Sequence, residues 1–298
     1  MKATRIGWAL LLAVPALCAG QNVDKVLLGA NKKPLPFTRT DEILEFIATA
    51  REVSSEALSV GITKARKLRL SKNGVVLHVI FHRVNWSEQK VKRLANGNVV
   101  MYLRDSYTSQ IAAFEISRLL GMTNVPPTIV RVSDGGAGSA QLWIEEARTE
   151  KNRQEGGLEP PDYNLWNQHY ADMRVYDNLI NNIDRNQGNM LVDSQWNLWL
   201  IDHTRAFGRD KTLPMPETVT RCSHQLWQAL QELDETEVRH KLAPVLTATE
   251  IEALLSRHHE LIELIRQRID EKGVETVLFD FGDPESEIKV EYTDAGTS

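Results

Sequence analysis

The segment that most constrains the fold is residues 181–207, NNIDRNQGNMLVDSQWNLWLIDHTRAF. Apolar residues at helical spacing end near Ile183, and the next six residues, DRNQGN, are turn formers. Residues 190–192 and 196–201 then read as two short strands on either side of an Asp-Ser turn. This pattern predicts a long helix, a polar loop and a small β-hairpin in direct succession.

The hairpin is expected to bring two polar side chains together. Asn189 enters its first strand and Asp202 leaves its second, and the outer ends of antiparallel strands lie close in space. Amide and carboxylate oxygens are hard ligands that suit Mg²⁺ or Mn²⁺ carrying the phosphates of a nucleotide. Asp184, five residues before Asn189, would then stand where a substrate hydroxyl arrives and would accept its proton.

The rest of the chain predicts an α+β fold of two lobes, a β-rich N-lobe over 21–150 and a helical C-lobe over 151–282. An Asn73-Gly74 turn predicts a hairpin, and Asp105 and Ser106 are candidate caps of the next helix. The glycine-rich stretch DGGAGSA is interpreted as a flexible connection between two strands. The expected helices are 40–54, 107–120, 165–180, 226–233, 237–246 and 249–272, and the expected strands are 66–84, 125–132 and 141–145.

The N-terminal residues predict export. Residues 1–20 carry two early basic residues, an apolar run and a small-residue exit, which is typical of a signal peptide and too short to span a membrane. We therefore expect a periplasmic or secreted protein with no transmembrane segment in the mature chain; a lipid anchor on Cys18 is the less favoured alternative.

Residues 283–298 are acidic and are predicted to be a disordered tail. The net charge of −5 argues against nucleic acid as a partner.

The polar loop also carries a family resemblance. Residues 184–189 resemble the Asp-Arg-His-x-x-Asn loop of phosphatidylinositol 3- and 4-kinases and of atypical kinases related to them in fold, namely HipA-type bacterial kinases and the secretory-pathway casein kinase family. Ile201-Asp202-His203 stands in the place of Asp-Phe-Gly. The helix and strand IAAFEISRLLGMTNVPPTIVRV is similar to the same region of bacterial members, so the resemblance covers about residues 60–210.

The resemblance implies an atypical kinase that uses ATP or another nucleoside triphosphate with Mg²⁺ or Mn²⁺. It implies Asp184 as catalytic base, with Asn189 and Asp202 as metal ligands. Arg185 would orient the loop, through Asp202 or a backbone carbonyl. The acceptor would be a hydroxyl of a protein, lipid or sugar, with substrate choice in residues 208–218.

In the N-lobe, the resemblance implies Glu115 as the helix acid that pairs with the nucleotide-binding lysine, and Glu145 in the hinge 143–145 where adenine binds. The best alignment places His82 at the lysine position, and a histidine with a pKa of about 6.5 is only about a quarter protonated at pH 7.

Three explanations stay open for this departure. Glu115 and phosphate favour the His82 cation; Lys64, Lys67 or Arg83 supplies the charge instead; or the protein is a pseudokinase that binds nucleotide without transfer. A metal-dependent hydrolase is a weaker alternative, because it does not account for the N-lobe.

Overall fold

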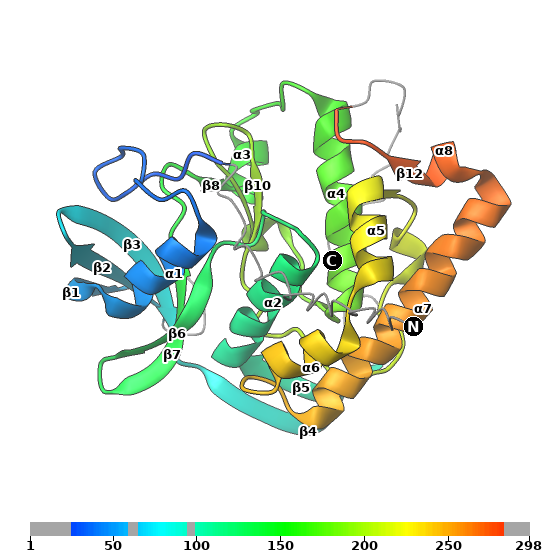
Figure 1. The fold of residues 1–298 in the computed structure, drawn as a ribbon, viewed down its shortest axis with the longest axis horizontal. Coiled ribbons are helices and arrows are strands. Elements are labelled where there is room, and N and C mark those ends of the chain that lie inside the picture. The colour runs from blue at the N-terminus through cyan, green and yellow to red at the C-terminus, as the bar shows by residue number, and fades with distance from the viewer. Residues whose placement is uncertain (1–24, 59–64, 94–98, 283–298) are drawn as a thin grey trace, which may run out of the picture.

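The computed structural model describes residues 25–58, 65–93 and 99–282, and it has two lobes (Figure 1). The predicted signal peptide and the predicted acidic tail lie outside the described residues. Within these ranges, no helix combines the length and apolar character needed to cross a membrane.

The N-lobe is built on a five-stranded antiparallel sheet in the order β1-β2-β3-β7-β6. The Asn73-Gly74 turn between β2 and β3 has φ of 51° and 78°, as a tight hairpin turn requires. A second such turn, Asp134-Gly135 with φ of 52° and 72°, joins β6 to β7. The strands are β1 (Arg51–Ala57), β2 (Arg66–Lys72), β3 (Val75–His82), β6 (Thr128–Ser133) and β7 (Gly136–Leu142).

Two N-lobe expectations were wrong. DGGAGSA is the turn and first half of β7, because its small residues allow close pairing with β6 and β3, so it is no flexible connection. The first helix, α1 (Thr40–Thr49), ends before residue 54, since residues 51–57 pair with β2 as an edge strand.

The two faces of this sheet have different neighbours. Ile43, Phe46 and Ile47 of α1 pack against alternate sheet residues such as Leu68 and Val79 in the N-lobe core. The intervening residues of β2 and β3 therefore point to the opposite face. Helix α2 (Tyr107–Leu119) contacts β7 and β6.

An unpredicted hairpin separates β3 from α2. Its strands β4 (Asn85–Arg93) and β5 (Val99–Ser106) pair with each other and run along the lower edge of Figure 1 toward α6 and α7 of the C-lobe. Ser106 caps α2, as expected, by accepting a hydrogen bond from the Thr108 amide at 3.2 Å.

The C-lobe is mainly helical, and its core packs around α4, the predicted long helix. The predicted hairpin is present as β9 and β10, which pair in antiparallel register with Leu198 opposite Val192. The longer elements are α4 (Tyr163–Leu179), α5 (His224–Glu232), α6 (Glu235–Leu242) and α7 (Ala248–Lys272). The short ones are β8 (Arg148–Thr149), α3 (Glu150–Glu155), η1 (Gln187–Asn189), β9 (Met190–Val192), β10 (Leu198–Leu200), η2 (Pro216–Thr218), β11 (Cys222–Ser223), α8 (Val274–Val277) and β12 (Leu278–Phe279).

Candidate active site

Arg185 organises the polar loop after α4. Its guanidinium forms two hydrogen bonds with the fully buried Asp177 carboxylate, at 2.9 and 3.0 Å, and its own side chain is 2% exposed. It also donates to the backbone carbonyls of Asn189 and Ile201, the latter at 3.0 Å, and contacts His203 Nε2 at 2.9 Å. Arg185 therefore ties α4, the loop and both ends of the hairpin into one unit. Asp202 or a backbone carbonyl was the expected partner of Arg185, and the structure shows backbone carbonyls in this role.

The hairpin places the two predicted metal ligands at its paired ends. The Ile201 amide donates to the Asn189 carbonyl at 3.2 Å, directly before Asp202. Asn189 Nδ2 donates to the Asp184 carbonyl at 3.0 Å, so the amide orientation assigned to Asn189 leaves Oδ1 as its acceptor. Asp202 has φ of 57°, a left-handed conformation uncommon for a residue with a Cβ, and its Oδ1 accepts from Thr204 Oγ1 at 3.2 Å.

Asp184 lies beside a second carboxylate that sequence reasoning assigned only to helix capping. Arg205 Nη1 donates to Asp184 Oδ2 at 3.2 Å, and Arg205 Nε lies 3.7 Å from Asp105 Oδ2. Asp105 is 4% exposed, and its Oδ1 has no hydrogen-bond partner among the described residues. Side chains alternate along β5, so Asp105 points away from the face that carries Arg104 and Ser106. This alternation could have indicated a separate role for Asp105 only if the strand itself had been predicted.

The surroundings of Asp184 raise its pKa. Partial burial raises the pKa of Asp184, and the nearby charges of Asp202 and Asp105 add to the increase, while Arg205 and Arg185 oppose it. A base with a raised pKa holds a transferred proton better than an ordinary aspartate does.

His82 faces these carboxylates from β3, yet it is 5% exposed and its Nδ1 has no hydrogen-bond partner among the described residues. Burial lowers the pKa of His82, and the charges of Asp202 and Asp105 only partly oppose that change. The imidazole is therefore neutral at pH 7. This argues against the explanation in which His82 supplies a resident positive charge.

Glu115, which was predicted to pair with the residue at position 82, lies near Arg118 instead. Its Oε1 lies 4.0 Å from Arg118 Nη1, and Arg118 also binds Asp41 at 2.7 Å. The carboxylates that act on His82 are those of Asp202 and Asp105. On α2, Gln110 accepts a hydrogen bond at 3.3 Å from Ser139 Oγ of β7, and Ser139 is paired with His82 in the sheet.

Glu145 lies in the predicted hinge, and its side chain is already paired. Its Oε1 is 2.5 Å from His78 Nδ1, and both side chains are largely buried. A nucleotide contact through the Glu145 side chain would have to replace this interaction. As a nucleotide-binding residue, Glu145 stays a prediction.

The side chains that could supply the missing positive charge do not all lie on the sheet face that carries His82. Lys67 is paired with Ile80 of β3, so it shares the sheet face opposite α1 with His82. Its Nζ lies 4.1 Å from the Trp143 ring centroid in the hinge. Arg83 instead donates to the Asp134 carbonyl at 2.9 Å in the β6–β7 turn, and Lys64 lies outside the described residues. Lys67 is thus the described candidate on the same face as His82.

The donor set fits a metal that arrives with its nucleotide. Among the described residues, no three His, Cys, Asp or Glu side chains form a ready-made metal site. Mg²⁺ is commonly held by one or two protein oxygens together with substrate phosphates and waters. The Asp202 carboxylate and Asn189 Oδ1, at adjoining hairpin ends, match that chemistry.

Comparison with known proteins identifies the fold. No family model matches the chain, and no curated protein matches its sequence. The structure of hydra Fam20 with sugar has a TM-score of 0.59 at 15% identity, covering 80% of this chain and 92% of the other. The Golgi casein kinase gives 0.58 at 15% identity over 82% and 80% of the two chains, and its structure with Mn/ADP bound gives 0.57 at 15% over 83% and 80%. This chain has a two-lobed α+β fold of the atypical kinase-like type, as its sequence predicted.

Proposed function

We propose that this protein is an atypical kinase that transfers a phosphoryl group from a nucleotide to a hydroxyl acceptor. The observation that carries the proposal is the Arg185-centred loop. It fixes Asp184, Asn189 and the backbone before Asp202 in a single hydrogen-bonded unit, although they belong to different elements.

The proposed roles follow from the chemistry of each group. Asp184 is the general base, since its carboxyl group is 36% exposed and its pKa is raised by burial and neighbouring acids. Asp202 and Asn189 would hold Mg²⁺ or Mn²⁺, which neutralises phosphate charge when bound. Arg205 bridges Asp184 and Asp105 and orients the base. Arg185 acts through the loop as a positioning residue.

The second candidate function is a pseudokinase, and a specific observation favours it. His82 is buried and has a lowered pKa, so it lacks the charge that the expected lysine would direct at the phosphates. In the kinase reading, Lys67 supplies that charge from the neighbouring strand. The two readings therefore differ in whether Lys67 reaches the nucleotide.

The acceptor is proposed only by class. A protein or sugar hydroxyl agrees with the names of the similar structures, a casein kinase and a sugar-bound Fam20, and a lipid hydroxyl remains an alternative. Residues 208–218 are the proposed recognition segment. Fully buried Arg257 fixes the start of this segment, because it donates to the carbonyls of Gly208 and Asp210. Export to a periplasm or cell exterior is part of the proposal and depends on residues 1–20.

The test uses purified protein, Mn²⁺ or Mg²⁺ and γ-labelled ATP, with casein and free saccharides as acceptors. A kinase transfers label, and Asp184→Asn reduces the rate by about 10² to 10⁴ because it removes the general base. Asp270→Asn, at an exposed position of α7 outside the proposed site and recognition segment, is the matched control and keeps the wild-type rate. Nucleotide binding without transfer to any acceptor would favour the pseudokinase.

A further inference from the structure

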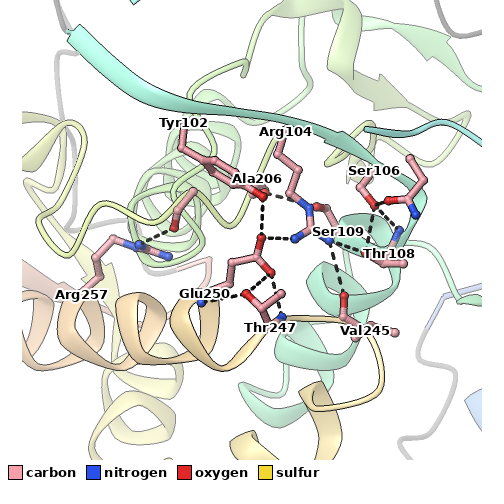
Figure 2. Close-up of polar contacts among 12 residues, drawn as sticks. Tyr102, Arg104, Ser106, Thr108, Ser109, Ala206, Val245, Thr247, Glu250 and Arg257 are labelled. Atoms are coloured by element: carbon pink, nitrogen blue, oxygen red, sulfur yellow. Dashed lines mark hydrogen bonds and ion pairs between the residues drawn. The ribbon is translucent and has the colours of Figure 1, made fainter. Parts of the chain in front are cut away.

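A polar cavity, separate from the candidate active site, lies on the other side of β5 from Asp105. It has a volume of about 380 Å³ and lies between the β4–β5 hairpin, the segment after Asp202 and the start of α7. Arg104 and Ser106 line it, while Asp105 between them faces the candidate active site. Figure 2 shows Tyr102, Arg104 and Thr108 converging with α7 in this region. The volume is in the range of small-molecule sites.

The carboxylate in this cavity, Glu250, is already saturated. It accepts hydrogen bonds from Arg104, from Tyr102 Oη at 3.2 Å, and from the amide and hydroxyl of Thr247 at 2.8 and 2.9 Å (Figure 2). Burial alone would raise the pKa of Glu250, but the hydrogen bonds from Arg104 and Thr247 and the charge of Arg104 outweigh it and keep the pKa lowered. Glu250 is therefore an ionised structural group that cannot neutralise a second cation.

The remaining charge in the cavity is positive. Arg104 has a side chain that is 8% exposed, and its terminal nitrogens contact Glu250, Thr108 and the Val245 carbonyl. Arg209 lies with its guanidinium carbon 4.1 Å from the Tyr102 ring centroid, and no described carboxylate forms an ion pair with it. The Nε atoms of Arg104 and Arg209 are both buried, and within the described ranges neither has a hydrogen-bond partner. Both residues line the cavity, and guanidinium groups with donors left unpaired favour an anion as its occupant.

Helix α2 strengthens the preference for an anion. Its N-cap Ser106 and first-turn Thr108 line the cavity, and its first turn contains no acidic residue. A 13-residue helix presents partial positive charge at this end. The helix terminus and the two arginines act in the same direction.

We propose that this cavity binds a small anionic ligand bearing a phosphate or carboxylate group, with Arg209 as its principal contact and Arg104 as a second. The site is separate from the candidate active site and does not depend on the proposed kinase function. It adjoins that site through the backbone, because the Ser106 amide donates to the Thr204 carbonyl at 2.9 Å, two residues after Asp202. A bound anion would connect the β4–β5 hairpin to the segment after Asp202.

The test is calorimetric titration of the full chain with inorganic phosphate, pyrophosphate and citrate, separately, in buffer free of metal and nucleotide. Arg209→Gln removes the unpaired charge and leaves the Arg104–Glu250 contact in place. Arg69→Gln, on the exposed part of β2, is the charge-matched control, and Asp202→Asn, at a residue that does not line the cavity, tests for binding at the candidate active site instead. Unfolding midpoints of all variants check that the fold is retained.

We expect at least one probe to bind and Arg209→Gln to weaken it about ten- to hundredfold, the size of a lost hydrogen bond to a charged group. Arg69→Gln and Asp202→Asn leave the affinity unchanged. Phosphate and pyrophosphate binding without citrate binding identifies a phosphate-bearing ligand, and the reverse identifies a carboxylate. Absence of binding by all three probes, or equal binding by Arg209→Gln and wild type, would overturn the proposal.

Discussion

The polar loop around Arg185 and the strand residue His82 contribute to the same candidate site, yet they differ in how their polar atoms are paired. In the loop, Arg185 and Asp177 are almost fully buried and form a bidentate pair, and the hairpin ends are fixed to them. On β3, His82 is equally buried but has an unpaired Nδ1 and a pKa lowered by burial. The loop is preorganised without a ligand, whereas the strand position lacks the charge that a phosphate would require.

This difference suggests where activity is limited. Preorganised groups lower the barrier because no rearrangement is needed during the reaction. In the proposed kinase, a neutral imidazole at position 82 would remove one electrostatic contribution, while the proposed base and metal ligands would stay in place. We therefore expect loop substitutions to abolish function and substitutions at His82 to tune it.

The largest effect is expected from Asp202→Asn. Loss of the carboxylate weakens metal binding and lowers the rate of phosphoryl transfer by about 10³-fold or more. Initial rates with γ-labelled ATP measure it. Asp270→Asn, on an exposed position of α7, is the matched control. A rate within a few-fold of wild type for Asp202→Asn would remove this residue from the site.

Arg185→Ala should have the largest effect on stability. It leaves the fully buried Asp177 carboxylate without its partner, which typically costs about 3–5 kcal/mol in free energy of unfolding. Arg205→Ala breaks an exposed pair with Asp184 and a longer contact, at 3.7 Å, with buried Asp105, so it should cost less than Arg185→Ala. Urea unfolding of both variants measures the difference. Equal losses in the free energy of unfolding would contradict the distinction between buried Arg185 and partly exposed Arg205.

His82→Lys sharpens the comparison from the other side. A lysine beside Asp202 and Asp105 would be charged, and we expect nucleotide affinity or transfer rate to rise by about ten- to hundredfold. His82→Gln provides the neutral control and should give no gain. If His82→Lys has no effect while Lys67→Ala removes nucleotide binding, Lys67 is the residue that supplies the charge.

A further effect concerns the pH dependence of stability. Burial lowers the pKa values of His82 and His203, and it lowers that of His169 to about 4. Below their usual pKa of about 6.5, the unfolded chain binds protons that the folded chain does not, so stability falls as pH decreases, by about 1 kcal/mol per histidine and pH unit. Burial raises the pKa of Asp172 to about 6, which offsets part of this loss. Urea unfolding between pH 7.5 and 5.5 checks the sign, and stability that rises on acidification would contradict it.

Local chemistry made the loop and hairpin predictable from sequence. Turn residues and strand alternation over 184–202 specify which residues meet, and the structure places Asn189 and Asp202 at paired hairpin ends. The contacts of Glu115 were not predictable in this way, since the direction of a helix side chain depends on which neighbours pack around it. Asp105 was missed because the hairpin that carries it, β4–β5, crosses between the lobes, and that path is set by tertiary contacts such as Arg104–Glu250.

The most direct test of the central claim is calorimetric titration of the wild-type protein with a non-hydrolysable ATP analogue, with and without Mn²⁺. We predict binding that is strengthened at least about tenfold by the metal, a difference of about 1.4 kcal/mol, because Asn189 and Asp202 would hold the nucleotide through its metal. Asp202→Asn should abolish this metal dependence. Affinity that is identical with and without metal, or no binding under either condition, would contradict the assignment of this loop and hairpin as a nucleotide site.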